Sequence, residues 1–255
     1  MLCCLWTPVA AGAAQELHDV RHSEHTSSIY DRAIVFFAEK IPETFKVRLE
    51  NSYHYIDMVK GIFSEKGIPA EIAYLPFIES GYSPWSIGPG GTAGLWQFVR
   101  STARSYGLRI DRYVDERKDP VKSTYAAAAY LRDLYSMFGS WDLTLIAYNA
   151  GAGKLRGVSD IYSTRGFSPI TKRYVPYLMA AYTIANDPER YGIETDGPEP
   201  EKLKSHREIV TDSSIHLETI AKKHSTTVKA IRNLNPALQT GKTPPYRYTI
   251  RVPSH

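Results

Sequence analysis

Proline and charged residues interrupt the apolar periodicity of this chain between Gly192 and His206. The interruption contains Gly197-Pro198-Glu199-Pro200 and then alternating charges. Such a stretch is typical of a linker, because it offers no apolar face that a core could bury. The sequence therefore predicts two folded parts, one before residue 192 and one over 207–253, joined by a linker over 192–206.

The part before the linker has the pattern of a series of helices. Apolar residues recur every three or four positions over 30–40 and 42–65, which predicts scaffold helices in an N-terminal region, 15–67. Asp119 and Pro120 predict the start of a helix to about 138, because an Asp cap followed by Pro suits a first turn. Further helices are expected over 69–81, 95–106, 142–150 and 171–185. No stretch alternates well enough for a substantial sheet, so the expected fold class is mainly α.

The residues after the linker differ in both pattern and charge. Short strands are predicted over 207–210 and 246–252, and helices over 217–223 and 228–234, in the order β-α-α-β. Residues 201–255 hold ten Lys and Arg against four Asp and Glu, net +6, which leaves 21 against 23, net −2, for residues 1–200. A basic excess favours an anionic partner, and peripheral association with a membrane or wall is one option. No nucleic-acid-binding motif accompanies it, so a nucleic-acid partner is not expected.

The first fourteen residues have the pattern of an export signal. An apolar run ends in small residues at 11–14 that are spaced like a signal-peptidase site. Residues 1–14 are therefore expected to be a signal segment, with the mature chain in the periplasm or cell envelope; an apolar arm of a cytosolic protein is the alternative. Cys3 and Cys4 are the only cysteines, so removal of this segment would leave no thiol for a disulfide or metal. No cofactor or metal is expected.

One carboxylate stands apart in the helical part. Glu79 is the only acidic residue between Glu71 and Asp111, and it follows Leu75-Pro76-Phe77-Ile78. A carboxyl group among apolar side chains has its charged form desolvated, so its pKa rises and it can donate a proton at neutral pH, as a general acid must. Pro76 is expected to kink the helix just before Glu79. A solvated glutamate at a helix end is the alternative interpretation.

Three further segments carry polar side chains that would be unfavourable in an apolar core without hydrogen-bond partners. Gln97 lies between Trp96 and Phe98, and a glutamine in such surroundings must be hydrogen-bonded if it is buried. Tyr148 and Asn149 precede a small-residue stretch over 150–153, and Tyr174 precedes a Val-Pro pair. Each alone fits a structural role, but together with Glu79 they form a more specific pattern.

That pattern resembles the soluble-lytic-transglycosylase-like family. Its signature motifs are matched, in order, by Glu79-Ser80, Gly94-Leu95-Trp96-Gln97-Phe98, Ala147-Tyr148-Asn149-Ala150-Gly151 and Thr171-Lys172-Arg173-Tyr174. The resemblance covers about residues 68–191 and implies a goose-type-lysozyme-like helical catalytic domain there. It also implies cleavage of the β-1,4 bond between N-acetylmuramic acid and N-acetylglucosamine in peptidoglycan, with a 1,6-anhydromuramoyl product. Ile170 and Lys172 depart from the family's usual Glu and Arg.

The resemblance also implies roles for the motif residues. Glu79 would be the single acid and base, with the acetamido group of the sugar replacing a second carboxylate. The implied substrate-binding and positioning residues are Ser80, Gln97, Tyr148, Asn149 and Tyr174. A hydrolytic muramidase on the same fold and a non-enzymatic wall-binding scaffold are the alternatives.

The C-terminal pattern is similar to a LysM module, a family that binds chains containing N-acetylglucosamine. The best-matching stretch is 217–236, whereas the usual Gly-Asp-Thr turn is replaced by Asp212-Ser213-Ser214. The resemblance implies peptidoglycan glycan strands as the partner, and a module on a flexible linker would raise the effective concentration of an enzyme on an insoluble polymer. A small domain that merely packs on the catalytic part is the alternative.

Overall fold

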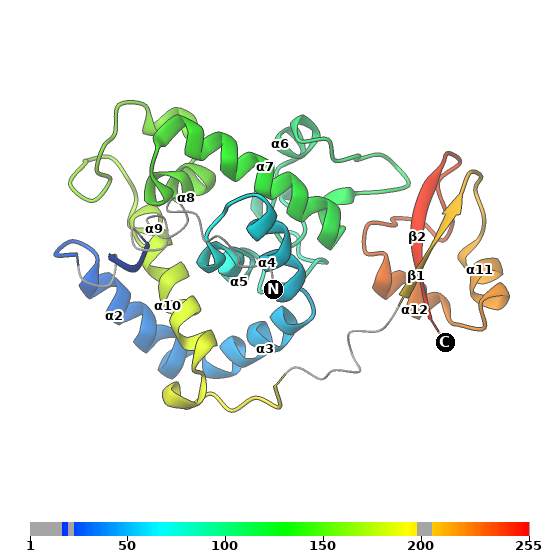
Figure 1. Cartoon of the computed structure of the whole chain (residues 1–255), viewed down its shortest axis with the longest axis horizontal. Coiled ribbons are helices and arrows are strands. Elements are labelled where there is room, and N and C mark those ends of the chain that lie inside the picture. The colour runs from blue at the N-terminus through cyan, green and yellow to red at the C-terminus, as the bar shows by residue number, and fades with distance from the viewer. Residues whose placement is uncertain (1–16, 20–22, 198–205, 255) are drawn as a thin grey trace, which may run out of the picture. The chain divides into compact units, whose positions relative to one another are not determined.

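The computed structural model describes residues 17–19, 23–197 and 206–254 (Figure 1). The expected signal segment, 1–14, and residues 198–205 of the expected linker lie outside these ranges. Across the described ranges, no helix combines the length and apolar character needed to cross a membrane. The chain divides into two compact units: the first joins Met1–Tyr82 to Ala127–Asp196, and the second joins Ser83–Ala126 to Gly197–His255. The second unit thus combines segments from both sides of the expected linker.

The first unit is built from helices. Helix α2 (Ser27–Val35) continues into a π-helical turn over Phe36–Lys40, and α10 (Tyr174–Asn186) packs beside α2 (Figure 1). The expected helix over 42–65 is two helices, α3 (Pro42–Tyr53) and α4 (Ile56–Glu65). The unit also contains a 3-10 helix over Ala70–Tyr74, α5 (Leu75–Glu79), most of α7 (Pro120–Phe138), α8 (Trp141–Ala150), a 3-10 helix over Ala152–Leu155, α9 (Pro169–Lys172) and a last 3-10 turn over Glu189–Tyr191.

Two helices of this unit lie within one residue of the boundaries that the sequence predicts, since α7 begins at Pro120 as expected and α8 begins at Trp141 in place of Asp142. The carboxylate of Asp119 caps α7, because its Oδ1 accepts the backbone N–H groups of Val121 at 3.0 Å and Lys122 at 2.9 Å. Helix α7 ends at Phe138, and Gly139 then takes a left-handed φ of 67°. The hydroxyl of Ser140 accepts the N–H of Leu143 and caps α8 in the same way.

Other helices differ from the expectation in where they begin or divide. The segment over 69–81 is a 3-10 helix followed by α5, with Pro76 in the first turn of α5. The predicted kink just before Glu79 is therefore wrong: proline lacks an N–H, and the first turn of a new helix needs none there. The helix expected over 95–106 is reduced to α6 (Arg100–Ser105), because Gln97 takes a left-handed φ of 49° and Ala93 pairs with Phe98. The helix expected over 171–185 is divided between α9 and α10.

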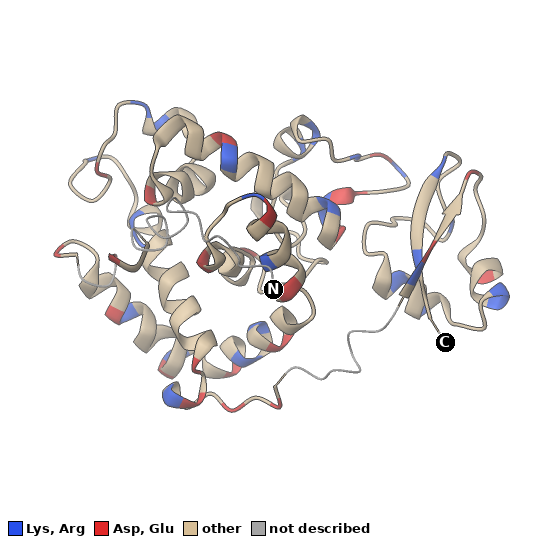
Figure 2. Ribbon diagram, viewed as in Figure 1, with Lys and Arg blue, Asp and Glu red and all other residues tan. Residues whose placement is uncertain are grey.

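The second unit contains the C-terminal module, here residues 206–254. Strand β1 (His206–Thr211) pairs antiparallel with β2 (Tyr248–Pro253), with Ile209 opposite Ile250. Helices α11 (Leu217–Lys223) and α12 (Val228–Leu234) lie between the strands in the chain, with the predicted limits and in the predicted order. Helix α11 carries Glu218 in its first turn and lysines in its last (Figure 2), which complements the helix dipole. The remaining helical turns of the unit are Pro89–Gly91, α6 and Glu116–Lys118.

Candidate active site

Glu79 is the last residue of α5, a helix of five residues that is too short to be stable alone. Aromatic packing holds this helix in place. The ring of Phe77 lies 4.5 Å from that of Phe45 and 6.3 Å from that of Phe37, centroid to centroid, and all three side chains are buried. Packing of the apolar face of α5 within the first unit therefore fixes the direction of the helix. Glu79, at the end of α5, is half-buried.

Burial raises the pKa of the Glu79 carboxyl group, and a hydrogen bond from Tyr174 works in the opposite direction. The Tyr174 hydroxyl, at the start of α10, donates to Oε1 of Glu79. Desolvation favours the neutral carboxyl, whereas a donated hydrogen bond favours the carboxylate. Desolvation is the larger effect, so the pKa of Glu79 is raised and the protonated form, which a general acid needs, is favoured.

Tyr148 contributes a second phenol from α8. Its side chain is half-buried, its ring lies 5.3 Å from that of Tyr130 on α7, and burial and then the charge of Glu79 raise the pKa of its hydroxyl. The pKa of Tyr174 rises for the same two reasons. Both phenols therefore stay protonated at neutral pH and are hydrogen-bond donors beside a carboxyl group. The structure brings together Glu79, Tyr148 and Tyr174, which come from three separate sequence motifs.

The backbone after Glu79 takes two left-handed residues, Gly81 at φ 61° and Tyr82 at φ 57°. A Cβ at Gly81 would lie 2.9 Å from Cγ of Arg48, so only glycine fits there without a shift. The carbonyl of Gly81 accepts Nδ2 of Asn51 at 3.0 Å, and the carbonyl of Phe77 accepts Nη1 of Arg48 at 3.3 Å. Sequence reasoning missed Arg48 and Asn51, since nothing local indicates that α3 faces the end of α5.

Ser80 and Asn149 have less specific positions. The Ser80 hydroxyl donates to the carbonyl of Pro76 at 3.2 Å, which terminates α5. Asn149 is exposed in the last turn of α8, one residue after Tyr148. Its amide is therefore available to solvent or to a ligand.

Gln97 belongs to the second unit and lies in a tight loop, residues 88–98, which we call the Gln97 loop. The Gln97 side chain is half-buried; its Oε1 accepts the hydroxyl of Thr92 at 2.8 Å, and its Nε2 donates to the carbonyl of Gly94 at 2.8 Å. A left-handed φ at a glutamine costs conformational energy, and such strain persists only where surrounding contacts enforce it. The loop thus holds the amide in one orientation.

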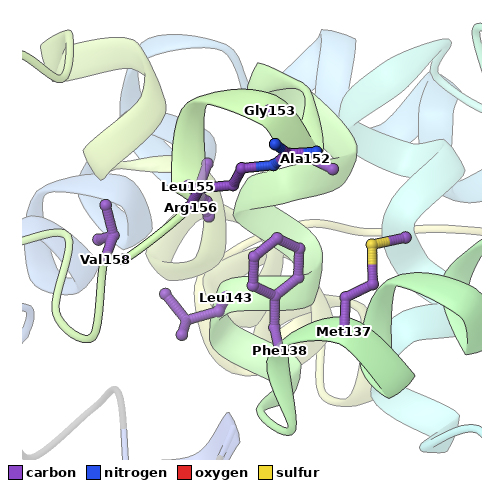
Figure 3. A pocket seen from close by; sticks show the side chains of 9 residues that line it. Met137, Phe138, Leu143, Ala152, Gly153, Leu155, Arg156 and Val158 are labelled. Atoms are coloured by element: carbon purple, nitrogen blue, oxygen red, sulfur yellow. The ribbon is translucent and has the colours of Figure 1, made fainter.

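The first unit also contains an open hollow of about 460 Å³. It lies between the end of α7 and the segment after α8 (Figure 3). None of the sequence-predicted site residues lines it. Its lining residues are Met137, Phe138, Leu143, Ala152, Gly153, Leu155, Arg156, Gly157 and Val158. Among the residues that the structure describes, no three His, Cys, Asp or Glu side chains gather as a metal site would require.

Comparison with known proteins shows which protein family the chain resembles around these residues. Residues 64–169 match the family model described as Transglycosylase SLT domain, and this range contains Glu79, Ser80, Gln97, Tyr148 and Asn149. The membrane-bound lytic murein transglycosylase D of Escherichia coli (strain K12) is 31% identical over 191 residues, which is 71% of this chain and 42% of that protein. The chain thus spans less than half the length of this relative.

Two further proteins are similar over shorter stretches. The peptidoglycan transglycosylase gp16 of Escherichia phage T7 is 29% identical over 145 residues, 54% of this chain and 11% of that protein. The solved lytic transglycosylase Slt of Pseudomonas aeruginosa, an inactive E503Q mutant, aligns with a TM-score of 0.42 at 20% identity, over 56% of this chain and 26% of that chain. Residues 64–169 of this chain are thus similar to a Transglycosylase SLT domain, and three of the four motifs that the sequence analysis singled out lie within them.

Proposed function

We propose that this chain is a peptidoglycan lytic transglycosylase. It cleaves the β-1,4 bond between N-acetylmuramic acid and N-acetylglucosamine and leaves a 1,6-anhydromuramoyl end. The observation that carries the proposal is the half-buried carboxyl of Glu79, whose pKa burial raises and which accepts a hydrogen bond from Tyr174. The names of the Escherichia coli and phage T7 relatives, a murein and a peptidoglycan transglycosylase, support this substrate class.

The proposed mechanism uses one carboxyl group twice. Protonated Glu79 gives its proton to the glycosidic oxygen as the bond from that oxygen to C1 breaks, and the acetamido carbonyl of the muramoyl sugar stabilises the positive charge at C1. The Glu79 carboxylate then takes the proton of the C6 hydroxyl while that oxygen bonds to C1. The proton returns to Glu79 and no water is consumed, so the products together have the mass of the substrate.

The phenols beside Glu79 suit this sequence of steps. Tyr174 donates to the carboxylate and stabilises it after the first proton transfer. Tyr148 adds a second protonated hydroxyl close to the charge of Glu79. We assign substrate binding to the amides of Gln97 and Asn149, and orientation of the substrate or of Glu79 to Ser80.

The finer features of the fold belong to the same proposal. We assign the helices over 68–191 to a lysozyme-like catalytic domain, and the β-α-α-β module to a LysM-like domain that binds glycan strands. The net charge of +6 over residues 201–255, ten basic against four acidic, adds attraction to an anionic wall or lipid surface. A glycan substrate of this kind places the protein in the cell envelope.

The decisive experiment is digestion of purified sacculi followed by mass spectrometry of the released muropeptides. We expect 1,6-anhydro products, which are one water lighter than the reducing sugars that a hydrolytic muramidase would release. Glu79→Gln keeps the shape of the side chain but removes the acid, and should lower the rate by about a thousandfold, within the usual range for a general acid-base group.

Glu65→Gln is the matched control, because Glu65 is also the last residue of a helix and is exposed. We expect Glu65→Gln to digest sacculi at the wild-type rate, with both variants unfolding at similar temperatures. Reducing-end products from the wild type would show that the protein is a hydrolytic muramidase and not a lytic transglycosylase. Full turnover by Glu79→Gln would remove Glu79 from the reaction.

A further inference from the structure

The C-terminal module does not complete its own core. Its buried cluster includes Val114, which is 0% exposed and lies in the stretch that matches the SLT domain model. Val114 lies in a segment, residues 109–122, which we call the docking segment. The module residues in the same cluster are Leu217, Ile220, Ala221, Ile231, Leu238, Tyr248, Ile250 and Val252. Because separation would expose apolar surface on both sides, the hydrophobic effect favours a docked module.

Backbone hydrogen bonds fix the register of this contact. Val114 forms an antiparallel bridge with Leu238. On one side of the bridge the N–H of Asp115 donates to the carbonyl of Ala237 at 2.9 Å, and on the other the N–H of Gln239 donates to the carbonyl of Tyr113 at 2.8 Å. Directional bonds of this kind allow only one alignment of the two segments.

Side-chain bonds join the two ends of the docking segment to β2 and the residues before it. Nη1 of Arg251 lies 2.9 Å from Oδ2 of Asp119, and both side chains are largely buried, at 13% and 7% exposure. The hydroxyl of Tyr246 donates to Oδ2 of Asp111 at 2.5 Å. Loss of one partner of a buried ion pair leaves the other charge buried and uncompensated, which is strongly destabilising. Substitution of Arg251 should therefore weaken the contact between the module and the docking segment.

The docking segment in turn holds the Gln97 loop. The Asp115 carboxylate binds Arg117 through two bonds, 2.9 Å to Nε and 2.7 Å to Nη2. Nη1 of Arg117 donates to the carbonyls of Gly91 at 2.6 Å and Phe98 at 2.9 Å, at either side of Gln97. A Cβ on Gly94 would lie 1.8 Å from the carbonyl oxygen of Arg117, so the loop backbone lies directly against the docking segment.

We propose that the C-terminal module is a positioning element for the Gln97 loop, in addition to any role as a tether on the glycan. Asp115 connects the two contacts, since its N–H binds the module and its carboxylate orients Arg117. Docking of the module restrains the docking segment, and this restraint keeps Arg117 and the Gln97 loop in one arrangement. The part of this inference that concerns substrate rests on the function proposed above, in which Gln97 contacts the sugar.

Hydrogen exchange of the full chain tests the coupling without any substrate. The amides of Gly88 and Ala93 are bonded within the loop, at 3.0 and 3.2 Å, and that of Gly94 donates to the carbonyl of Ser86 just before it, at 3.0 Å, so all three report opening of the loop. Arg251→Ala should speed their exchange by about tenfold, because loss of the ion pair lowers the cost of local opening. Arg247→Ala, which removes an exposed positive charge from the same module, is the matched control and should leave exchange unchanged.

Two more variants keep the test decisive if Arg251→Ala unfolds the module. Arg251→Lys keeps a positive charge opposite Asp119 and should restore most of the protection. Tyr246→Phe keeps the ring and removes the hydrogen bonds of its hydroxyl to Asp111 and Arg109, so it should give a smaller increase than Arg251→Ala. Wild-type exchange of the loop in a variant whose module is released would overturn the proposal.

Turnover of a soluble peptidoglycan oligosaccharide separates positioning from tethering, because a tether brings no advantage on a freely diffusing substrate. Arg251→Ala should lower kcat/KM on this substrate by about tenfold, since small displacements of binding groups are costly. If amide exchange in the Gln97 loop becomes faster while kcat/KM stays unchanged, the module does not position Gln97 for the substrate, and that part of the proposal is wrong. A wild-type protein without lytic activity would refute the proposed function, and the exchange result would still decide the coupling.

Discussion

Glu79 and Gln97 are held in place by different kinds of interaction. Glu79 ends a short helix whose inner face packs through Phe77 against other buried aromatic rings, and one hydroxyl reaches its carboxylate. Gln97 lies in a loop with left-handed backbone, and the charged pair of Asp115 and Arg117 binds that loop through its carbonyls.

The difference matters because the two kinds of support respond differently to substitution. Apolar packing is not directional, so it tolerates side chains of similar volume. A buried polar network depends on every partner, because an unpaired buried group retains its full desolvation cost. We therefore expect a graded response around Glu79 and an all-or-none response around Gln97.

The largest effect on stability is expected from Phe77→Ala. Loss of a buried aromatic ring should lower the free energy of unfolding by about 4 kcal/mol, because a cavity remains between Phe37 and Phe45. Phe77→Leu, which fills most of that space, should cost about 1.5 kcal/mol or less. Urea unfolding measures both values, and equal losses for the two variants would contradict a graded response.

A somewhat smaller loss, about 3 kcal/mol, is expected from Arg117→Met, because this variant leaves a buried carboxylate without its partner. Burial alone would raise the pKa of Asp115, but the hydrogen bonds and charge of Arg117 outweigh it, so the pKa lies below its ordinary value. Asp115 therefore stabilises the fold above its unfolded pKa, and this contribution is lost as the pH falls through the folded pKa.

The double variant Asp115→Asn with Arg117→Met sharpens this prediction. It removes both charges and should recover part of the lost stability, whereas independent sites would give additive losses. Urea unfolding at neutral pH measures the interaction between the two positions, and strict additivity would argue against an all-or-none network.

The smallest effect on stability is expected from Tyr174→Phe, about 1 kcal/mol for one lost hydrogen bond. Its effect on pH dependence is more informative. Tyr174 stabilises the Glu79 carboxylate, so its removal should raise the pKa of Glu79 further. Because the first step needs protonated Glu79, the alkaline limb of the kcat/KM profile should move to higher pH. Movement to lower pH would show that the phenol does not act on the carboxylate in this way.

Local chemistry explains why some elements were predictable. The Asp119-Pro120 start of α7, the limits of α11 and α12 and the order of the C-terminal elements all follow from capping and periodicity within a few residues. The isolated position of Glu79 among apolar residues likewise predicted a raised pKa, and the structure agrees.

Contacts between distant parts of the chain explain what was missed. The division of α3 from α4, the left-handed Gln97 and the reset of the helix at Pro76 depend on packing that no local window contains. Arg48 and Arg117 carry no motif, because they act through backbone carbonyls, which every residue possesses.

The sequence by itself determined the start of α7, the limits of α11 and α12 and which carboxyl group has apolar neighbours, because capping, periodicity and desolvation act over short distances. Only the tertiary structure decided that Tyr174 bonds to Glu79 and that Val114 fills the core of the C-terminal module. These contacts join residues 95 or more positions apart, and their free energy appears only once the chain has closed the intervening loops.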